Sequence, residues 1–231
     1  MWNRNSSSPT PSSWCAGAPR LSPVSLSRAA AKAGVDGVLV ITPYYNKPTP
    51  EGQFRHYKAV AAAAEVPVML YNVPSRTGVN ILPETTARMY AEIPNITSIK
   101  EAAGSVDQIS AILSLCDINV LSGDDSLTLP MMSVGAAGVV SVAANVVPAD
   151  VSAMVNAWHA GKVEEARRLH YKMMPIFKAL FIETNPIPVK TALKMLGLCN
   201  GALRMPLCEL RPENEKKLRE TLVKYGLEVK A

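Results

Sequence analysis

The sequence has little of what builds a disulfide scaffold, a metal centre or a membrane anchor. Its four cysteines include no Cys-x-x-Cys pair, and its three histidines are scattered along the chain. The longest apolar stretches, such as residues 139–147, are too short to span a bilayer. The N-terminus also lacks the continuous apolar core of a secretion signal. We therefore expect a protein of a reducing, cytoplasmic compartment with no membrane role.

Charge of one sign is not concentrated either. The 231 residues are 48% hydrophobic and 19% charged, with a formal net charge of +5. Basic residues gather only modestly, at residues 216–217 and 167–168, so nucleic acid is not a favoured partner. The composition predicts one large domain with a substantial core, and an anionic small substrate would need only one or two basic side chains in a cleft.

Five short β-rich runs alternate with helical patterns in the first two thirds of the chain. The runs cover residues 38–42, 68–71, 96–100, 120–122 and 139–142. Such alternation predicts a parallel sheet, either open or closed into a barrel. One helix before residue 66 has Phe54, Tyr57 and Ala61 on one face. Beyond residue 147 the strands stop, and helices are expected over residues 148–160, 163–180, 186–196 and 212–225. In the second of these, core or interface residues are predicted at helical spacing: Val163, Ala166, Leu169, Met173, Ile176 and Leu180. Residues 1–25, which contain many serines and prolines and no acidic residue, predict a loop or disorder.

A lysine and a tyrosine stand at the ends of neighbouring runs. Because strand residues alternate between faces, Ile96, Ser98 and Lys100 share one face of their strand, and Met69 and Tyr71 share one face of theirs. Both reactive side chains can therefore point the same way. An amine held where solvent is scarce has a lowered pKa and becomes a nucleophile for Schiff-base chemistry. A nearby phenol could then relay protons.

Polar or turn residues follow all five runs. They are Tyr44, Tyr45 and Asn46 after the first, Tyr71 and Arg76 after the second, Lys100 at the third, Gly123, Asp124 and Asp125 after the fourth, and Asn145 beyond the fifth. Active sites of α/β barrels lie at the carboxyl ends of the strands. The sequence therefore predicts one site at this face.

At these residues the sequence closely resembles the dihydrodipicolinate synthase family of pyruvate-dependent class I aldolases and lyases. The resemblance extends from about Ala30 to the C-terminus. It rests on residues 42–48 (Thr-Pro-Tyr-Tyr-Asn-Lys-Pro), 71–78 (Tyr-Asn-Val-Pro-Ser-Arg-Thr-Gly), 99–102 (Ile-Lys-Glu-Ala), 121–125 (Leu-Ser-Gly-Asp-Asp) and 138–141 (Gly-Val-Val-Ser).

The resemblance implies roles for six residues. Lys100 would form a Schiff base with pyruvate, Tyr71 would relay protons, and Tyr45 would reach into a neighbouring subunit's site in a homotetramer. The enamine would attack L-aspartate 4-semialdehyde to give a cyclic precursor of lysine on the diaminopimelate route. Arg76 would bind the semialdehyde's carboxylate, and Gly123 and Val140 would line the pyruvate side through their backbone. No metal or organic cofactor is implied.

The family pattern leaves alternatives open. N-acetylneuraminate lyase and sugar-acid aldolases share the lysine and the tyrosine, although residues 75–78 favour the synthase. Tyr44 is the candidate left for feedback control by lysine. These residues could also have purely structural roles. In that case Tyr44 and Tyr45 only pack between subunits, and Arg76 pairs with a local carboxylate. We expect Glu101 to be a solvated or strand-end charge.

The chain also departs from the family. Members have eight β/α units and a Gly-Thr-Thr-Gly-Glu motif near the N-terminus, and this sequence contains neither the motif nor three further strands. We therefore expect a non-homologous segment at residues 1–25, an incomplete (β/α)8 TIM barrel of five units at residues 26–147, and a helical bundle at residues 148–231. The alternative to an active enzyme is a catalytically impaired fragment that only associates with intact subunits.

Overall fold

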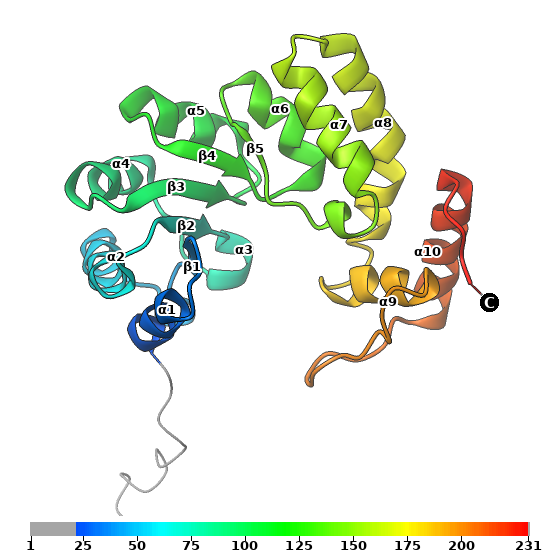
Figure 1. Ribbon diagram of the computed structural model, residues 1–231, viewed down its shortest axis with the longest axis horizontal. Helices are drawn as coiled ribbons and strands as arrows, with labels where there is room; N and C mark the ends of the chain where they lie inside the picture. The colour runs from blue at the N-terminus through cyan, green and yellow to red at the C-terminus, as the bar shows by residue number, and fades with distance from the viewer. Residues whose placement is uncertain (1–21, 231) are drawn as a thin grey trace, which may run out of the picture.

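A five-stranded parallel sheet lies at the centre of the fold (Figure 1). The computed structural model describes residues 22–230. The strands follow one another in chain order, and all neighbouring pairs are parallel. They are β1 (Val38–Ile41), β2 (Val68–Asn72), β3 (Ile96–Glu101), β4 (Asn119–Ser122) and β5 (Gly138–Val139). The parallel sheet and its five strands are thus confirmed, although the fifth strand is shorter than the predicted run at residues 139–142.

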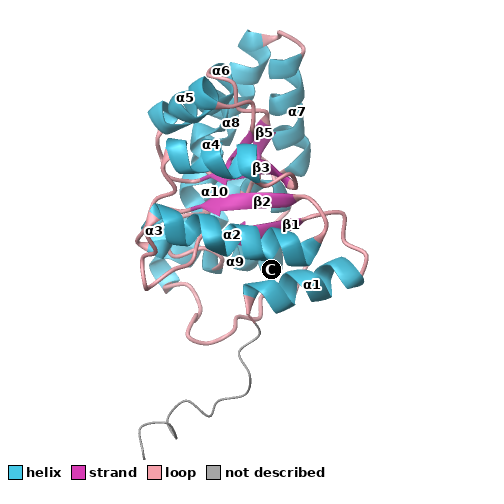
Figure 2. Ribbon diagram, turned by 90° about the vertical axis from the view of Figure 1, so that its left-hand side faces the viewer, coloured by secondary structure: helices cyan, strands magenta, loops and turns pink. Residues whose placement is uncertain are grey.

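Helices precede and separate the strands, and all but the short helix directly after β2 lie along one side of the sheet (Figures 1 and 2). They are α1 (Pro23–Lys32), α2 (Pro50–Ala64), α3 (Pro74–Thr77), α4 (Pro83–Glu92), α5 (Val106–Leu115) and α6 (Thr128–Ser133), with a 3-10 turn η2 (Asp125–Leu127) before α6. Most begin with proline at the first helical position, where the missing N–H is not needed.

The predicted start of regular structure at about residue 26 is wrong by one helical turn. Pro23 opens α1, and the Ser22 hydroxyl accepts a hydrogen bond from the Ser25 N–H. A serine cap followed by proline is a helix start, which the many serines and prolines of this region concealed. The rest of the expectation for residues 1–25 falls on residues 1–21, outside the described residues.

One apolar core fills the space between the sheet and these helices. Val40, Leu70 and Ile99 point from the strands into it. The predicted helix face of Phe54, Tyr57 and Ala61 is buried there, together with Met89, Ile109 and Ile112 from α4 and α5. This side of each strand is therefore fixed by apolar burial, and the other side is left for the polar residues at the strand ends.

The second half of the molecule is helical, as predicted. Its elements are a 3-10 turn η3 (Ala143–Asn145) and the helices α7 (Pro148–His159), α8 (Val163–Ala179), α9 (Ile187–Met195) and α10 (Pro212–Tyr225). The helical spacing in α8 is confirmed for Leu169, Met173 and Ile176, which are buried in a second core, whereas Val163 at its start is 38% exposed. Helix α6 joins the two cores, because Leu129 packs into the second and Met131 into the first.

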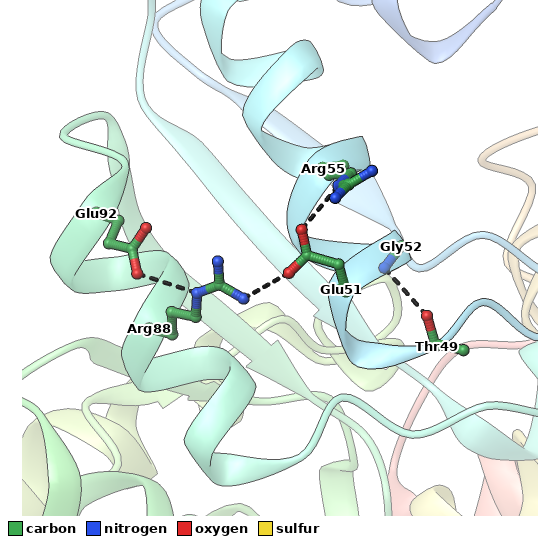
Figure 3. A network of polar contacts seen from close by, with 6 residues as sticks. All are labelled: Thr49, Glu51, Gly52, Arg55, Arg88 and Glu92. Atoms are coloured by element: carbon green, nitrogen blue, oxygen red, sulfur yellow. Dashed lines mark hydrogen bonds and ion pairs between the residues drawn. The ribbon is translucent and has the colours of Figure 1, made fainter.

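A chain of exposed ion pairs connects α2 and α4 on the outer surface (Figure 3). Arg88 donates to Glu51 at 2.7 Å and to Glu92 at 3.0 Å, and Arg55 donates to Glu51 at 2.7 Å. The hydrogen bond from Arg88 is the main cause of the lowered pKa of Glu51. The Arg88 guanidinium also lies 3.9 Å from the centre of the Phe54 ring. Such exposed pairs add little stability, so the apolar core dominates.

Within residues 22–230, no helix has both the length and the apolar character needed to cross a membrane. Cys116, Cys199 and Cys208 are free thiols.

Removing one buried hydroxyl should measurably weaken the first core. Tyr57 is fully buried, and its hydroxyl donates to the Val40 carbonyl at 3.0 Å. Tyr57→Phe leaves that carbonyl without this donor, and we expect the free energy of unfolding to fall by about 1–2 kcal/mol in urea titrations. Tyr171→Phe is the matched control, because Tyr171 is 66% exposed and should tolerate the change. Equal losses for the two variants would contradict this prediction.

Candidate active site

Lys100 and Tyr71 lie together at the ends of adjacent strands. They are direct partners in the β2–β3 register, and the Lys100 amine lies 4.2 Å from the centre of the Tyr71 ring. Both side chains are partly buried. The structure thus brings together the two residues that strand alternation predicted on one face.

The surroundings of these two residues shift their pKa values in opposite directions. Burial lowers the pKa of Lys100, while the carboxylates of Asp124 and Asp125 act against that shift and Arg76 adds to it. Burial raises the pKa of Tyr71, Arg76 opposes the rise, and Asp124 adds to it. The amine is therefore more readily neutral than a solvated lysine, and the phenol keeps its proton. This is the state in which one can attack a carbonyl and the other can donate.

Gly123 provides the space that the lysine occupies. A Cβ atom at this position would lie 3.1 Å from Lys100 Cε and 2.5 Å from the Cβ of Ala102. The Gly123 N–H donates to the Glu101 carbonyl at 2.7 Å, which continues the pairing of β3 with β4. Glycine is thus required here by close packing rather than by its conformational freedom.

Asp125 holds the turn that carries Val140. The Asp125 side chain, 4% exposed, accepts hydrogen bonds from the Ser141 hydroxyl and from the N–H groups of Val142 (3.1 Å) and Ala143 (3.0 Å). Val140 lies just past β5, with its N–H donated to the Ser122 carbonyl at 2.9 Å. The sequence analysis counted Asp125 only as a turn residue. This role of Asp125 could not be predicted from the sequence, because its hydrogen-bond partners are 16 to 18 residues away.

The two aspartates also border an open cleft of about 390 Å³ between η2 and α8. Its other lining residues are Ser126, Met174, Phe177, Lys178 and Phe181. One carboxylate oxygen of Asp124 is buried and has no hydrogen-bond partner among the described residues. Burial is the main cause of the raised pKa of Asp124. The cleft therefore lies beside the turn that follows β4 and next to a carboxylate oxygen without a hydrogen-bond partner among the described residues.

Arg76 sits on α3, directly after β2, and is exposed. Its guanidinium donates to the Asn185 carbonyl at 3.1 Å. The alternative that Arg76 pairs with a local carboxylate is wrong for the described part of the chain, because this partner is a main-chain carbonyl 109 residues away. Sequence analysis missed Asn185, and no pattern in the sequence connects it with Arg76. A single neutral partner leaves the guanidinium with donors for an anionic ligand.

Tyr44 and Tyr45 lie in the loop after β1 and are strongly exposed. They are 65% and 93% exposed, and Tyr45 has a left-handed backbone with φ of 71°. A tyrosine with positive φ is uncommon, so this turn holds its aromatic side chain outward at some backbone cost.

Glu101 is the last residue of β3, so of the two expectations for it the strand-end position is confirmed and the solvated charge is wrong. Glu101 is fully buried, and its carboxylate accepts hydrogen bonds from Asn72, Gln108 and the Ala103 N–H. Burial raises its pKa, and these hydrogen bonds oppose the rise. Strand alternation explains the error, because Glu101 points to the face opposite Lys100, under the helices.

Comparisons with known proteins agree with this geometry. Residues 16–225 match the family model described as "Dihydrodipicolinate synthetase family". The chain belongs to this family. The resemblance was expected to begin at about Ala30, and the family match begins nearer the N-terminus, at residue 16.

Relatives in the family are similar over most of the chain. The chain is 54% identical to a 4-hydroxy-tetrahydrodipicolinate synthase of Persephonella marina over 207 residues, covering 88% of this chain and 71% of the relative. A crystal structure of dihydrodipicolinate synthase from Aquifex aeolicus has a TM-score of 0.88 at 50% identity, covering 90% of this chain and 72% of that one. The enzyme from Cyanidioschyzon merolae with lysine bound has a TM-score of 0.86 at 41% identity, with coverages of 89% and 70%.

The charge of Asp124 should control the pH at which Lys100 reacts. Because this carboxylate raises the pKa of Lys100, Asp124→Asn should lower that pKa further and move the pH midpoint of amine reactivity downward. The rate of borohydride trapping with a carbonyl compound, measured as a function of pH by intact mass, gives the midpoint. Asp107→Asn, the same change at an exposed position of α5, should leave the midpoint unchanged. An unchanged or higher midpoint in Asp124→Asn would contradict this assignment.

Proposed function

We propose that this chain is a 4-hydroxy-tetrahydrodipicolinate synthase, which condenses pyruvate with L-aspartate 4-semialdehyde in lysine biosynthesis. The observation that carries the proposal is the Lys100 amine, lowered in pKa by burial and lying 4.2 Å from the centre of the Tyr71 ring at paired strand ends. Curated relatives about half identical to the chain bear this name. The alternative of an N-acetylneuraminate lyase type of aldolase has no comparable support.

The first step is Schiff-base formation at Lys100. The neutral amine attacks the ketone carbon of pyruvate, and loss of water from the carbinolamine leaves an iminium ion. Water departs more easily when its oxygen is protonated, and the Tyr71 hydroxyl is the acid within the site. The nearby carboxylates of Asp124 and Asp125 favour the positive charge that the iminium carries.

The second step forms the carbon–carbon bond. The Tyr71 phenolate left by the first step takes a proton from the pyruvate methyl group, which converts the iminium into an enamine. The enamine carbon attacks the aldehyde of the semialdehyde, and the alkoxide that forms takes the proton back from Tyr71. Arg76 suits the semialdehyde's carboxylate, since a guanidinium can meet a carboxylate with two parallel hydrogen bonds. The amino group of the semialdehyde then attacks the iminium carbon, which closes the ring and expels Lys100 as a free amine, and the proton set free returns to the Tyr71 phenolate.

Gly123 and Val140 form the pyruvate side of the site in this proposal. Their main-chain N–H groups already donate to the Glu101 and Ser122 carbonyls. Gly123 and Val140 therefore contribute the shape of this side of the pyruvate site and their main-chain carbonyl oxygens. Gly123 also keeps the space beside Lys100 Cε open.

We infer a barrel-type architecture of five β/α units at residues 26–147, followed by a helical region at residues 148–231. Sequential parallel strands with helices on their outer side support it. Tyr45 would act across a subunit boundary, which its 93% exposure permits. The homotetramer, the cytoplasmic location and the role of Tyr44 in lysine feedback stay predictions.

Trapping of pyruvate tests the proposed chemistry directly. After incubation with pyruvate and sodium borohydride, intact mass should show one reduced pyruvate adduct per chain, because borohydride reduces the iminium to a stable amine. Lys100→Ala should lose the adduct, and Lys178→Ala, in the neighbouring cleft, should keep it. Circular dichroism confirms folding of each protein. A folded chain that forms no adduct would instead support the impaired-fragment alternative.

Substitutions of Tyr71 and Arg76 should impair different steps of the reaction. Tyr71→Phe should lower kcat for condensation by about 10²- to 10⁴-fold, because general acid–base help is lost. Arg76→Ala should leave pyruvate trapping intact and raise KM for the semialdehyde by about 10- to 100-fold, because charge-assisted hydrogen bonds are lost. Steady-state kinetics with each substrate varied separates the two. Loss of pyruvate trapping in Arg76→Ala would contradict its assignment to the second substrate.

A further inference from the structure

A buried polar cluster lies directly behind the reactive pair. Asn72 follows Tyr71, and Glu101 follows Lys100, so alternation directs both to the opposite, helix-covered face. They are direct partners in the β2–β3 register, one step beyond the pair Tyr71 and Lys100. Both are fully buried. Polar groups in such a place must be hydrogen-bonded, or they cost stability.

The cluster joins four segments of the chain through close hydrogen bonds. The Asn72 side-chain amide donates to both Glu101 oxygens, at 3.1 and 3.0 Å, and to the side-chain Oδ1 of Asn80 at 2.7 Å. The Gln108 amide of α5 donates to Glu101 at 2.8 Å. The Asn80 amide, from the loop before α4, donates to Gln108 at 2.7 Å. The strand ends are thus connected to each other and to a loop and a helix.

Two main-chain N–H groups fix the direction of every hydrogen bond in this cluster. The Ala103 N–H donates to the Glu101 carboxylate at 2.8 Å, and the Ile81 N–H donates to the side-chain Oδ1 of Asn72 at 3.0 Å. Amide side chains can exchange donor and acceptor by rotating, but a main-chain N–H cannot. The cluster therefore needs one group that only accepts, and the carboxylate of Glu101 is that group.

We propose that Glu101 is a positioning residue, whose carboxylate, through Asn72, Gln108 and the Ala103 N–H, holds the ends of β2 and β3 in the register that sets the Lys100 amine against Tyr71. This rests on the proposed function for its catalytic consequence. The carboxylate touches neither substrate nor the reacting atoms, and acts only through the backbone that carries Lys100.

The isosteric change Glu101→Gln tests the inference. Its new amide group faces the Gln108 amide across the 2.8 Å contact, so two donors meet. Rotation of the side-chain amides of Gln108, Asn80 and Asn72 does not remove the clash of donors. After all three have rotated, the Asn72 amide nitrogen faces the Ile81 N–H, and two donors meet there instead. We expect borohydride trapping of pyruvate to slow by about 10- to 100-fold, the typical cost of misplacing a reactive group. The pH midpoint of trapping should stay unchanged, because the amine's charged neighbours Asp124 and Asp125 remain.

Exchanging the carboxylate and the amide between positions 101 and 108 should restore the hydrogen bonds of the cluster. In the double variant Glu101→Gln/Gln108→Glu, the amide at 101 donates to the carboxylate at 108, which also accepts from Asn80. The Ala103 N–H and Asn72 still find an oxygen at 101. The contacts that are lost are those of the Gln108 amide with Asn80 (3.2 Å) and with the Ile81 carbonyl (3.4 Å), and one of the two from Asn72 to residue 101 (3.0 Å). Trapping should return to within a few-fold of the unaltered chain. Gln108→Glu alone would put two carboxylates in contact and should also be slow.

Amide hydrogen exchange reports on the cluster without any substrate. Exchange at Ala103 and Ile81 should accelerate in Glu101→Gln and slow again in the double variant, with unfolding temperatures measured for all proteins. Unaltered trapping in Glu101→Gln, or slow trapping in the double variant despite restored protection, overturns the inference. If the unaltered chain traps no pyruvate, the proposed function fails. The positioning role then stands or falls on the exchange at Ala103 and Ile81 alone.

Discussion

The site depends on the register between β2 and β3. With Tyr71 opposite Lys100 and Asn72 opposite Glu101, one pair of strand ends presents a phenol and an amine on one face and a buried amide and carboxylate on the other. A slip of one residue would exchange the two faces, placing a lysine in the apolar core and a glutamate at the site. The apolar residues Leu70 and Ile99 resist such a slip, and the polar cluster does so at the strand ends, where apolar burial stops.

Two buried carboxylates hold the backbone on either side of the lysine. Glu101 accepts from the main chain just after β3, and Asp125 accepts from the turn after β5. Backbone that leaves a parallel sheet loses its ladder partners, and buried N–H groups there need another acceptor. A carboxylate can accept several such bonds at once. These acids therefore keep the strand ends ordered where substrate must meet an exact arrangement, which aliphatic side chains could not do.

The parts that follow from periodicity were predictable, and the parts that follow from distant partners were not. Alternation placed Tyr71 and Lys100 on one face, and helical spacing placed Phe54 and Tyr57 in the core. Alternation also placed Glu101 opposite Lys100, yet its burial depends on Asn80 and Gln108, which no local pattern connects with it. The contact of Arg76 with Asn185 spans 109 residues and leaves no trace in either local sequence. Family resemblance identified the chemistry, but the supporting acids had to be found in three dimensions.

The charges around Lys100 act in opposite senses before and after the amine reacts. Burial frees the amine from its proton, whereas Asp124 and Asp125 favour the protonated form, as does the face of the Tyr71 ring. Taken alone, these groups would hinder attack on a ketone. The iminium formed by that attack is itself a cation, however, and it lies in the same field. The aspartates thus reduce the fraction of neutral, reactive amine but stabilise the iminium intermediate. Such stabilisation accelerates the reaction only to the extent that it is stronger in the transition state than in the resting site. Removing Asp124 should therefore ease the first attack and weaken the hold on the iminium, so a lower pH midpoint need not bring faster turnover.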